Sequence, residues 1–234
     1  MTPTILYEDN HVIAVRKPHG LLVQGDDTGD PTLINEVRYF LKQRENKPGN
    51  VFLGMVHRLD RPVGGVVIFG KTSKGAARLS EQFRSRGVEK VYWCVVEGGV
   101  GRRGELGEGG VVKQWLLKDE QRNVVTAFDH EVPNAQYAET AWKVMKELGD
   151  DRWLIEVRPK TGRPHQIRLA MKTIGMPIVG DVKYGANDPL QLPLGKGEGR
   201  SCIALMARAL SFDHVVTKER MTVIAEPELE IFYG

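Results

Sequence analysis

Short apolar runs separated by turn residues recur along most of the chain, a pattern typical of a protein rich in β-strands. Residues 5–7 and 11–16 flank Asp9-Asn10 and predict a strand, a turn and a strand. Residues 66–69, Val-Val-Ile-Phe, lie close to glycines on both sides and predict a strand buried on both faces. The same reasoning predicts further strands at 88–96, 111–117, 123–130, 135–146, 152–158, 202–212 and 220–226.

Apolar positions at helical spacing predict two helices in the first part of the chain. The first has Thr32 as its N-cap and runs to about Glu45. The second begins after Thr72 or Ser73 and ends before Gly87, because glycine is favoured just beyond the end of a helix.

A third helix is predicted to have Pro164 at its first position and to end at Gly175. Its apolar stripe consists of Ile167, Ala170, Met171 and Ile174. His165, Arg168 and Lys172 lie on the other side, and Arg168 is expected at the edge of the stripe, partly shielded from water.

The connections between the predicted strands are short, and Gly149-Asp150-Asp151 predicts a hairpin. Residues 98–110 and 186–200 read as loops because they are rich in Gly and Pro. We therefore expect an α+β fold, with a mixed, mostly antiparallel central sheet flanked by a few helices. Neither a repeat nor a clear linker is visible, so we expect a single domain over 1–234.

The composition, with 27% charged and 41% hydrophobic residues, is that of an ordinary globular protein. The two cysteines, Cys94 and Cys202, have no Cys-x-x-Cys spacing, so neither a disulfide framework nor a zinc site is indicated. No secretory signal and no apolar run of about 18 residues are visible in the sequence. We expect a soluble, cytoplasmic protein without membrane contact.

Positive charge is concentrated in two segments. Residues 57–90 contain eight Lys or Arg against three Asp or Glu, and residues 158–172 contain five Lys or Arg and no acid. Such segments suit contact with a polyanion, although two solvated basic faces would look the same.

Asp60 lies between Arg58 and Arg61, just ahead of the predicted buried strand. It is either part of a structural ion pair or a reactive carboxylate held ionised by a neighbouring arginine, which lowers an Asp pKa by about 1–3 units. Arg168 is the candidate for that arginine. Tyr92 is either a core residue or a ring on which an unstacked base packs.

Two other readings are disfavoured. Residues 65–72 satisfy the nucleotide-binding pattern G-x-x-x-x-G-K-[ST], but the variable positions are Val, Val, Ile and Phe, which belong in a strand and not in a phosphate loop. His57, His165 and Asp60 do not have the spacing of metal ligands, so no metal is expected.

Five ordered motifs resemble those of the RluA family of RNA pseudouridine synthases. They are His-Arg-Leu-Asp-Arg at 57–61, Lys-Val-Tyr at 90–92, and the segments 158–168, 175–185 and 205–214. The resemblance spans nearly the whole chain. It implies the pseudouridine synthase catalytic fold and conversion of uridine to pseudouridine in RNA by base flipping, without a cofactor or metal.

The resemblance also implies residue roles. Asp60 matches the essential aspartate, which attacks C1′ of the ribose or C6 of the base, or assists loss of a 2′ proton. Tyr92 matches the tyrosine that stacks on the target base and is a candidate for removing the C5 proton. Arg168 matches the arginine paired with the catalytic carboxylate, and Arg58 the arginine that enters the space left by the flipped nucleotide. Leu205 matches an apolar residue of the uracil pocket.

The residues expected to bind RNA are Arg58, Arg61, Lys71, Lys160, Arg163 and His165. The chain departs from the family at Pro62-Val63-Gly64-Gly65, where a hydroxyl is lost, and at Met206. We expect a monomer acting on rRNA or tRNA, without the S4 module of many relatives. The alternative is a non-catalytic RNA-binding protein that retains the fold.

Overall fold

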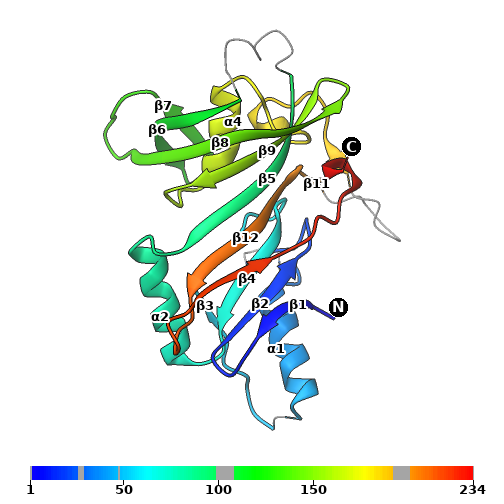
Figure 1. Cartoon of the computed structure of the whole chain (residues 1–234), viewed down its shortest axis with the longest axis vertical. Coiled ribbons are helices and arrows are strands. Elements are labelled where there is room, and N and C mark those ends of the chain that lie inside the picture. Colours follow the sequence, from blue (N-terminus) through cyan, green and yellow to red (C-terminus); the bar gives the residue numbers. More distant parts are fainter. Residues whose placement is uncertain (1, 26–28, 47, 99–107, 192–200, 234) are drawn as a thin grey trace. The chain divides into compact units, whose positions relative to one another are not determined.

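The computed structural model describes the whole chain except residues 1, 26–28, 47, 99–107, 192–200 and 234. The chain divides into two compact units (Figure 1). Unit 1 comprises Met1–Glu89 and Met206–Glu228, and unit 2 comprises Lys90–Leu205 and Leu229–Gly234. A single domain over 1–234 stays a prediction.

Unit 1 is built on a sheet whose order is β1 (Thr4–Glu8), β2 (Val12–Lys17), β4 (Gly64–Gly70), β12 (Leu205–Asp213) and β13 (Arg220–Ile224). The short β3 (Gly54–Met55) also pairs with β4. β4 and β12 run parallel, and the other pairs are antiparallel. All of β4 is buried, as the apolar run at 66–69 predicts, so the segment that imitates a nucleotide loop is a core strand.

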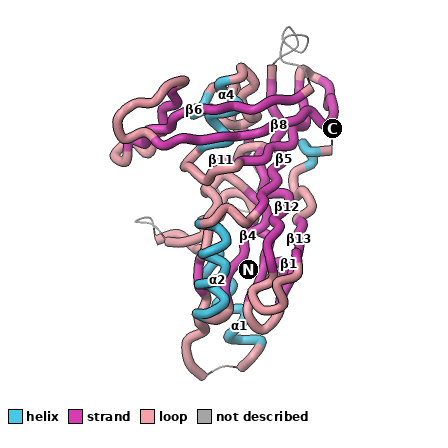
Figure 2. Tube along the Cα trace, turned by 60° about the vertical axis from the view of Figure 1, so that its left-hand side comes forward, coloured by secondary structure: helices cyan, strands magenta, loops and turns pink. Residues whose placement is uncertain are grey.

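Helices α1 (Leu33–Arg44) and α2 (Ser73–Arg84) belong to unit 1, and Figure 2 traces α2 beside β4. Thr32 and Thr72 cap them, each side-chain oxygen accepting a backbone N–H of the first turn. The prediction for Gly87 is wrong by one position. Arg86 is the left-handed residue (φ 62°), and Gly87 instead donates its N–H to the Gln82 carbonyl at 2.8 Å, closing the helix end.

Unit 2 is built on an antiparallel sheet in the order β5 (Glu89–Glu97), β9 (Arg152–Pro159), β8 (Gln136–Gly149), β6 (Gly109–Asp119) and β7 (Val124–Phe128). Asp150 and Asp151 form the two-residue hairpin turn between β8 and β9, with φ values of 50° and 56°, as predicted. The predicted strand at 202–212 is interrupted. Its first part is β11 (Ser201–Cys202), which pairs with β10 (Leu190–Gln191), and β12 follows.

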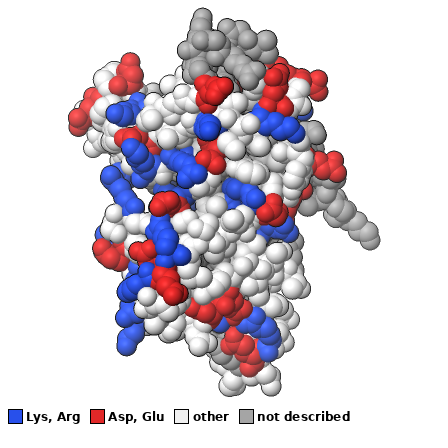
Figure 3. All heavy atoms as spheres, in the orientation of Figure 1, with Lys and Arg blue, Asp and Glu red and all other residues white. Residues whose placement is uncertain are grey.

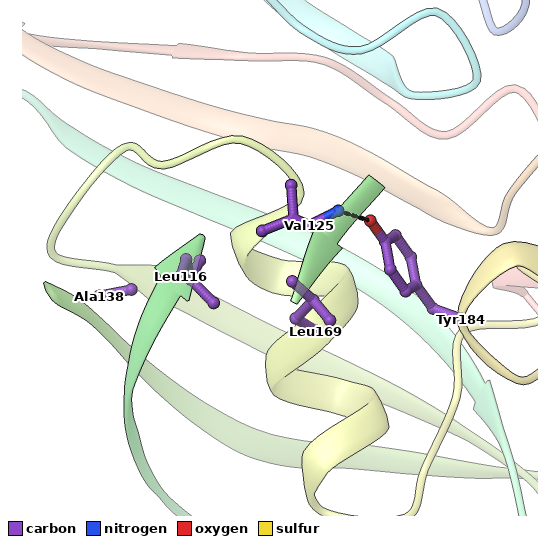
Figure 4. Close-up of a cluster of buried hydrophobic side chains, with 5 residues drawn as sticks. All are labelled: Leu116, Val125, Ala138, Leu169 and Tyr184. Carbon is purple, nitrogen blue, oxygen red and sulfur yellow. Dashed lines mark hydrogen bonds between the residues drawn. The ribbon is translucent and has the colours of Figure 1, made fainter. Parts of the chain in front are cut away.

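Helix α4 (Gln166–Thr173) packs on one face of this sheet. Figure 4 shows Leu169 of the helix with the core residues Leu116, Val125, Ala138 and Tyr184. Tyr184 lies in a 3-10 turn, η1 (Val182–Tyr184), and a second one, η2 (Glu230–Phe232), lies near the end of the chain.

The prediction of Pro164 as the first helical residue is wrong. His165 has a left-handed backbone (φ 53°), so the helix begins at Gln166. The Gln166 Oε1 atom accepts hydrogen bonds from the Thr161 hydroxyl (2.7 Å) and the Arg163 N–H (3.0 Å), which holds the preceding loop in place of a longer helix. The predicted end at Gly175 is confirmed, since its φ is 75° and its N–H donates to the Lys172 carbonyl.

The fold is therefore α+β with mostly antiparallel pairing, as the sequence predicts. Much of the predicted loops at 98–110 and 186–200 lies outside the described residues. None of the helices in the described part of the chain is long and apolar enough to cross a membrane.

Candidate active site

Asp60 lies in a tight turn directly before the buried strand β4. The Val63 N–H donates to the Asp60 carbonyl oxygen at 3.1 Å, and Leu59 and Val63 on either side are buried. Asp60 itself is half-buried. The buried side chains of Leu59 and Val63 hold the backbone in place. The Asp60 carboxylate is therefore attached at a fixed point just before a core strand.

His57 fastens the start of this loop to the sheet. Its Nε2 atom accepts the Ile68 backbone N–H at 3.0 Å, and its ring stacks on Phe83 of α2 with 4.7 Å between ring centroids. Because Nε2 accepts, it carries no proton in this arrangement. The sequence placed His57 in the motif at 57–61 and disfavoured it as a metal ligand, but it contains no signal for this bond to a residue eleven positions away.

Lys17 fastens the other end of the loop. The side chain is fully buried, and its Nζ atom donates to three backbone carbonyls, those of Arg61 (3.1 Å), Pro18 (3.1 Å) and Leu21 (2.5 Å). The Gly20 N–H donates to the same Arg61 carbonyl at 2.9 Å. The turn after β2 is thus joined to the loop that carries Asp60.

Lys17 also contributes a charge to the surroundings of Asp60. Burial lowers the pKa of Lys17 to about 7, while the negative charges of Asp60 and Glu228 act to raise it. Three carbonyl acceptors match the three N–H donors of an ammonium group, and a neutral amine would leave one acceptor unsatisfied. The charges of Lys17 and Asp60 attract each other, which favours the ammonium form of Lys17.

The cations predicted near Asp60 differ in exposure. Arg58 is exposed. Arg61 forms an ion pair with Asp30 at 2.7 Å and donates through Nε to the Gly20 carbonyl at 3.3 Å. Lys71 is more enclosed, because its Nζ atom lies 2.6 Å from a Glu8 oxygen and 2.8 Å from the Asp9 carbonyl oxygen.

The basic residues of α2 extend this surface. Figure 3 shows Lys and Arg atoms gathered at the side of the molecule that carries α2, with Asp and Glu atoms between them. The exposed cations on or next to this helix are Lys74, Arg78, Arg84 and Arg86. The positive balance of residues 57–90 therefore includes a solvent-exposed cluster.

The remaining predicted catalytic residues belong to unit 2. Tyr92 is half-buried on β5, opposite Val157 of β9. Leu205 is buried at the start of β12. Arg168 is buried in the first half of α4, more deeply than its expected place at the edge of the apolar stripe.

Arg168 is held by two residues to which the sequence assigned no role. Its Nε and Nη2 atoms each donate to one oxygen of the buried Asp181 carboxylate, both at 2.6 Å. Its guanidinium carbon lies 4.8 Å from the centroid of the Tyr184 ring. A bidentate pair plus a ring contact fixes the plane of the guanidinium group.

Tyr184 is in turn fixed by its hydroxyl. The Val125 N–H donates to it at 3.1 Å, as Figure 4 shows, and the His165 Nδ1 atom lies 2.5 Å away. His165, predicted to bind RNA, is thus bonded to the tyrosine that supports Arg168. Asp181 and Tyr184 both lie in the segment 175–185 that resembles the family. Only the folded structure shows that they contact Arg168.

The other basic residues near α4 form ion pairs or hydrogen bonds within the protein. Lys160 forms an ion pair with Glu139 at 2.5 Å, and the Arg163 Nε atom donates to the Tyr137 carbonyl at 3.2 Å. Lys90 donates to the Thr161 carbonyl at 2.8 Å, which ties β5 to the segment before α4.

The cysteines are buried, as predicted, and burial raises the pKa of the Cys94 thiol and that of Cys202 to about 11. Neither is therefore a reactive thiolate. Among the described residues, no group of three or more His, Cys, Asp or Glu is arranged to hold a metal ion.

Comparison with known proteins decides the family. Residues 11–173 match the family described as RNA pseudouridylate synthase. The chain belongs to this family. The resemblance of its motifs to the RluA family is thereby confirmed.

Two curated relatives are ribosomal large subunit pseudouridine synthase C of Rickettsia bellii and tRNA pseudouridine synthase C of Haemophilus ducreyi. The first is 34% identical over 195 residues, covering 83% of this chain and 60% of the relative. The second is 32% identical over 227 residues, covering 94% and 89%. The chain therefore spans about 60% of the length of the rickettsial protein.

A solved human structure, RNA Pseudouridylate Synthase Domain Containing 4, has the same fold with a TM-score of 0.74. It is 24% identical, and the match covers 98% of this chain and 90% of that one. The expected pseudouridine synthase fold is thereby confirmed.

Proposed function

We propose that this protein isomerises uridine to pseudouridine in RNA, with Asp60 as its catalytic group. The observation that carries the proposal is the family match over residues 11–173, which includes Asp60, Tyr92 and Arg168. The 1–234 chain then acts as a single catalytic domain.

The reaction breaks the N1–C1′ bond, turns the held uracil and joins C5 to C1′. C5 gives up its proton and N1 gains one, so the change is an isomerisation that needs no oxidant or reductant. Asp60 acts on C1′ or C6, or assists loss of a 2′ proton. Because the freed base stays bound, its return is effectively intramolecular.

Arg168 pairs with the Asp60 carboxylate in this proposal, and Asp181 with Tyr184 supplies the support for the guanidinium group. Tyr92 stacks on the flipped uracil and is the candidate for removing the C5 proton, and Leu205 lines the pocket. A buried arginine that is already oriented can stabilise a carboxylate without reorganisation during the reaction.

Base flipping costs a few kcal/mol. Stacking on an aromatic ring contributes about 1–3 kcal/mol per base, and phosphate contacts contribute the rest. Arg58, which is exposed, enters the space that the flipped nucleotide leaves. The RNA-binding set is Arg58, Arg61, Lys71, Lys160, Arg163 and His165, of which Lys71 reaches phosphate only by exchanging its contact with Glu8.

The substrate class is rRNA or tRNA, in line with the names of the curated relatives. The protein acts as a cytoplasmic monomer and uses neither metal nor cofactor. Nothing observed favours the alternative of a non-catalytic RNA-binding protein.

The test is to map pseudouridines in total rRNA and tRNA from a strain that lacks the gene, by chemical adduct formation and primer extension. We expect at least one site to disappear and to return with the wild-type gene but not with Asp60→Asn. An unchanged map, or rescue by Asp60→Asn, would overturn the proposal.

A further inference from the structure

The sheet of unit 2 has a second face, opposite α4, that carries a row of aromatic rings. Trp115 of β6 pairs in register with Tyr137 of β8 on one side and with Phe128 of β7 on the other. Cross-strand partners point to the same face of a sheet. Their chain neighbours Leu116, Ala138 and Ala127 belong to or pack against the core under α4, so the three rings point away from it.

The rings are accessible in the described structure. Tyr137 is 37% exposed, and Trp115 and Phe128 are half-buried. The Trp115 and Tyr137 rings meet edge to face with 5.3 Å between their centroids, and His130 lies at the edge of Phe128. The order along the row is therefore Tyr137, Trp115, Phe128 and His130.

Basic side chains border this row. By the strand register, Lys113 and Lys143 share the face, and Arg158 of β9 lies opposite Ala141 of β8. Lys160 follows two residues later along the same strand direction, and Arg163 is bonded to the Tyr137 backbone. We name this surface, with its rings Phe128, Trp115 and Tyr137 and its cations Lys113, Lys143, Arg158, Lys160 and Arg163, the aromatic face.

Two acidic residues of the aromatic face are paired with its cations, and a third, Asp119 at the end of β6, lies 3.9 Å from Arg122. Glu139 is paired with Lys160 at 2.5 Å, and Glu156 with Arg158 at 2.8 Å. Lys113 and Lys143 are exposed, and Lys143 lies opposite Glu156 in register. The surface therefore has a positive balance beside exposed rings, which disfavours an apolar protein partner and suits a polyanion with flat groups.

We propose that the aromatic face binds a single-stranded segment of the RNA substrate, with bases stacked on Tyr137, Trp115 and Phe128 and phosphates on the neighbouring cations. Bases in a duplex are stacked on each other, whereas unpaired bases stack readily on protein rings. This surface is distinct from Tyr92, which points to the α4 side with its register partner Val157. The inference rests on the proposed function only for the identity of the RNA.

The test uses a short fluorescein-labelled RNA that contains only adenosine and cytidine, so that it offers no uridine to the catalytic residues. Binding to the full chain is measured by fluorescence anisotropy. Trp115→Leu and Tyr137→Leu are each expected to weaken binding about tenfold, since stacking contributes about 1–3 kcal/mol per base and 1.4 kcal/mol corresponds to tenfold. Val182→Ala, which removes an exposed apolar side chain elsewhere in unit 2, is the control and should not change the affinity.

A second test uses a double variant of two surface lysines, which leaves the hydrophobic core unchanged. Lys113→Gln with Lys143→Gln removes two phosphate contacts, and the slope of log affinity against log salt should fall by about 1.4. Lys42→Gln on α1 is the matched charge control and should leave the slope unchanged. Unchanged affinity in the ring variants together with an unchanged slope would overturn the proposal. The proposal would also be overturned if the ring variants lost self-association, measured by sedimentation, and did not lose RNA binding.

The outcome separates this proposal from the proposed function. If the ring variants lose affinity while the wild-type protein makes no pseudouridine, the aromatic face stands and the catalytic proposal fails. If pseudouridine forms and the ring variants bind the uridine-free RNA as the wild type does, the catalytic proposal stands and the proposal for the aromatic face fails.

Discussion

The position of Asp60, the proposed catalytic group, depends on bonds made by residues far away in the sequence. The turn that holds the carboxylate is joined to the end of β2 by Lys17 and Gly20, and to β4 by His57. Asp60 and its flanking arginines can be identified from the sequence alone. The sequence contains nothing that singles out Lys17, because its three acceptors are backbone carbonyls, which every residue has.

We predict that Lys17→Met destabilises the protein strongly. Each buried carbonyl left without a donor costs roughly 1–3 kcal/mol, and the carbonyls of Pro18 and Leu21 lose theirs, while that of Arg61 keeps the Gly20 N–H. The free energy of unfolding in urea measures this, with exposed Lys42→Met as the control. A loss no larger than that of the control would show that the three bonds contribute nothing.

Asp181 is predicted to act through Arg168. In Asp181→Asn the Arg168 guanidinium group loses one of its two carboxylate oxygen partners and the negative charge that balances its own. Its orientation is therefore held less firmly. A displacement of about 1 Å costs on the order of a hundredfold in rate. We therefore expect kcat to fall about tenfold to a hundredfold while KM for RNA changes little.

Lys172→Gln, an exposed change on the same helix, is the comparison for this variant. A purely structural role for Asp181 would lower the melting temperature and the amount of active enzyme without changing the kcat of the folded fraction.

At the level of elements, local signals were sufficient for most strands and for α1, because apolar periodicity and the Thr32 cap are encoded nearby. They failed where one residue takes an unusual backbone. His165 and Arg86 are both left-handed although neither is glycine, and each moved a helix boundary from its predicted place. At Arg86 the N–H of the following Gly87 closes the helix end, whereas at His165 the Gln166 side chain accepts hydrogen bonds from the preceding loop.

Gly65 ties two elements closely. Its φ is 111°, and a Cβ atom there would lie 2.2 Å from the Ala207 carbonyl oxygen of β12. Glycine at this position therefore serves the close packing of β4 against β12. Gly65→Ala should destabilise the protein by about 2–5 kcal/mol through backbone strain and overlap, measured by urea unfolding. A loss below about 1 kcal/mol would mean that β12 shifts freely.

Glu8 joins β1 to α1 and to the residue after β4. Hydrogen bonds from Arg44 lower the pKa of Glu8 to about 2, helped by Lys71 and opposed by burial. A lowered folded-state pKa stabilises the protein at pH values above the unfolded pKa of about 4.5, and this contribution disappears as the pH falls towards 2. Glu8→Gln should therefore flatten the acid limb of the stability curve, whereas exposed Glu131→Gln should not.

At the scale of the whole molecule, the family was recognisable from five ordered motifs, and the match over residues 11–173 agrees with that reading. The motifs indicated the proposed catalytic residues but not the residues that hold them in place. Asp181 and Tyr184 lie in a recognised segment, yet their contact with Arg168 follows only from the packing of α4 against η1. The aromatic face was invisible for the same reason, since its rings come from three separate strands.

The most direct test of the account is tritium release from transcribed rRNA and tRNA that carry uridine labelled at C5. Forming the new bond at C5 expels that hydrogen, so the wild-type protein is predicted to release tritium from at least one RNA. Asp60→Asn is predicted to release none while still binding the RNA. Release by Asp60→Asn at the wild-type rate, or no release by the wild type from any candidate RNA, would contradict the account.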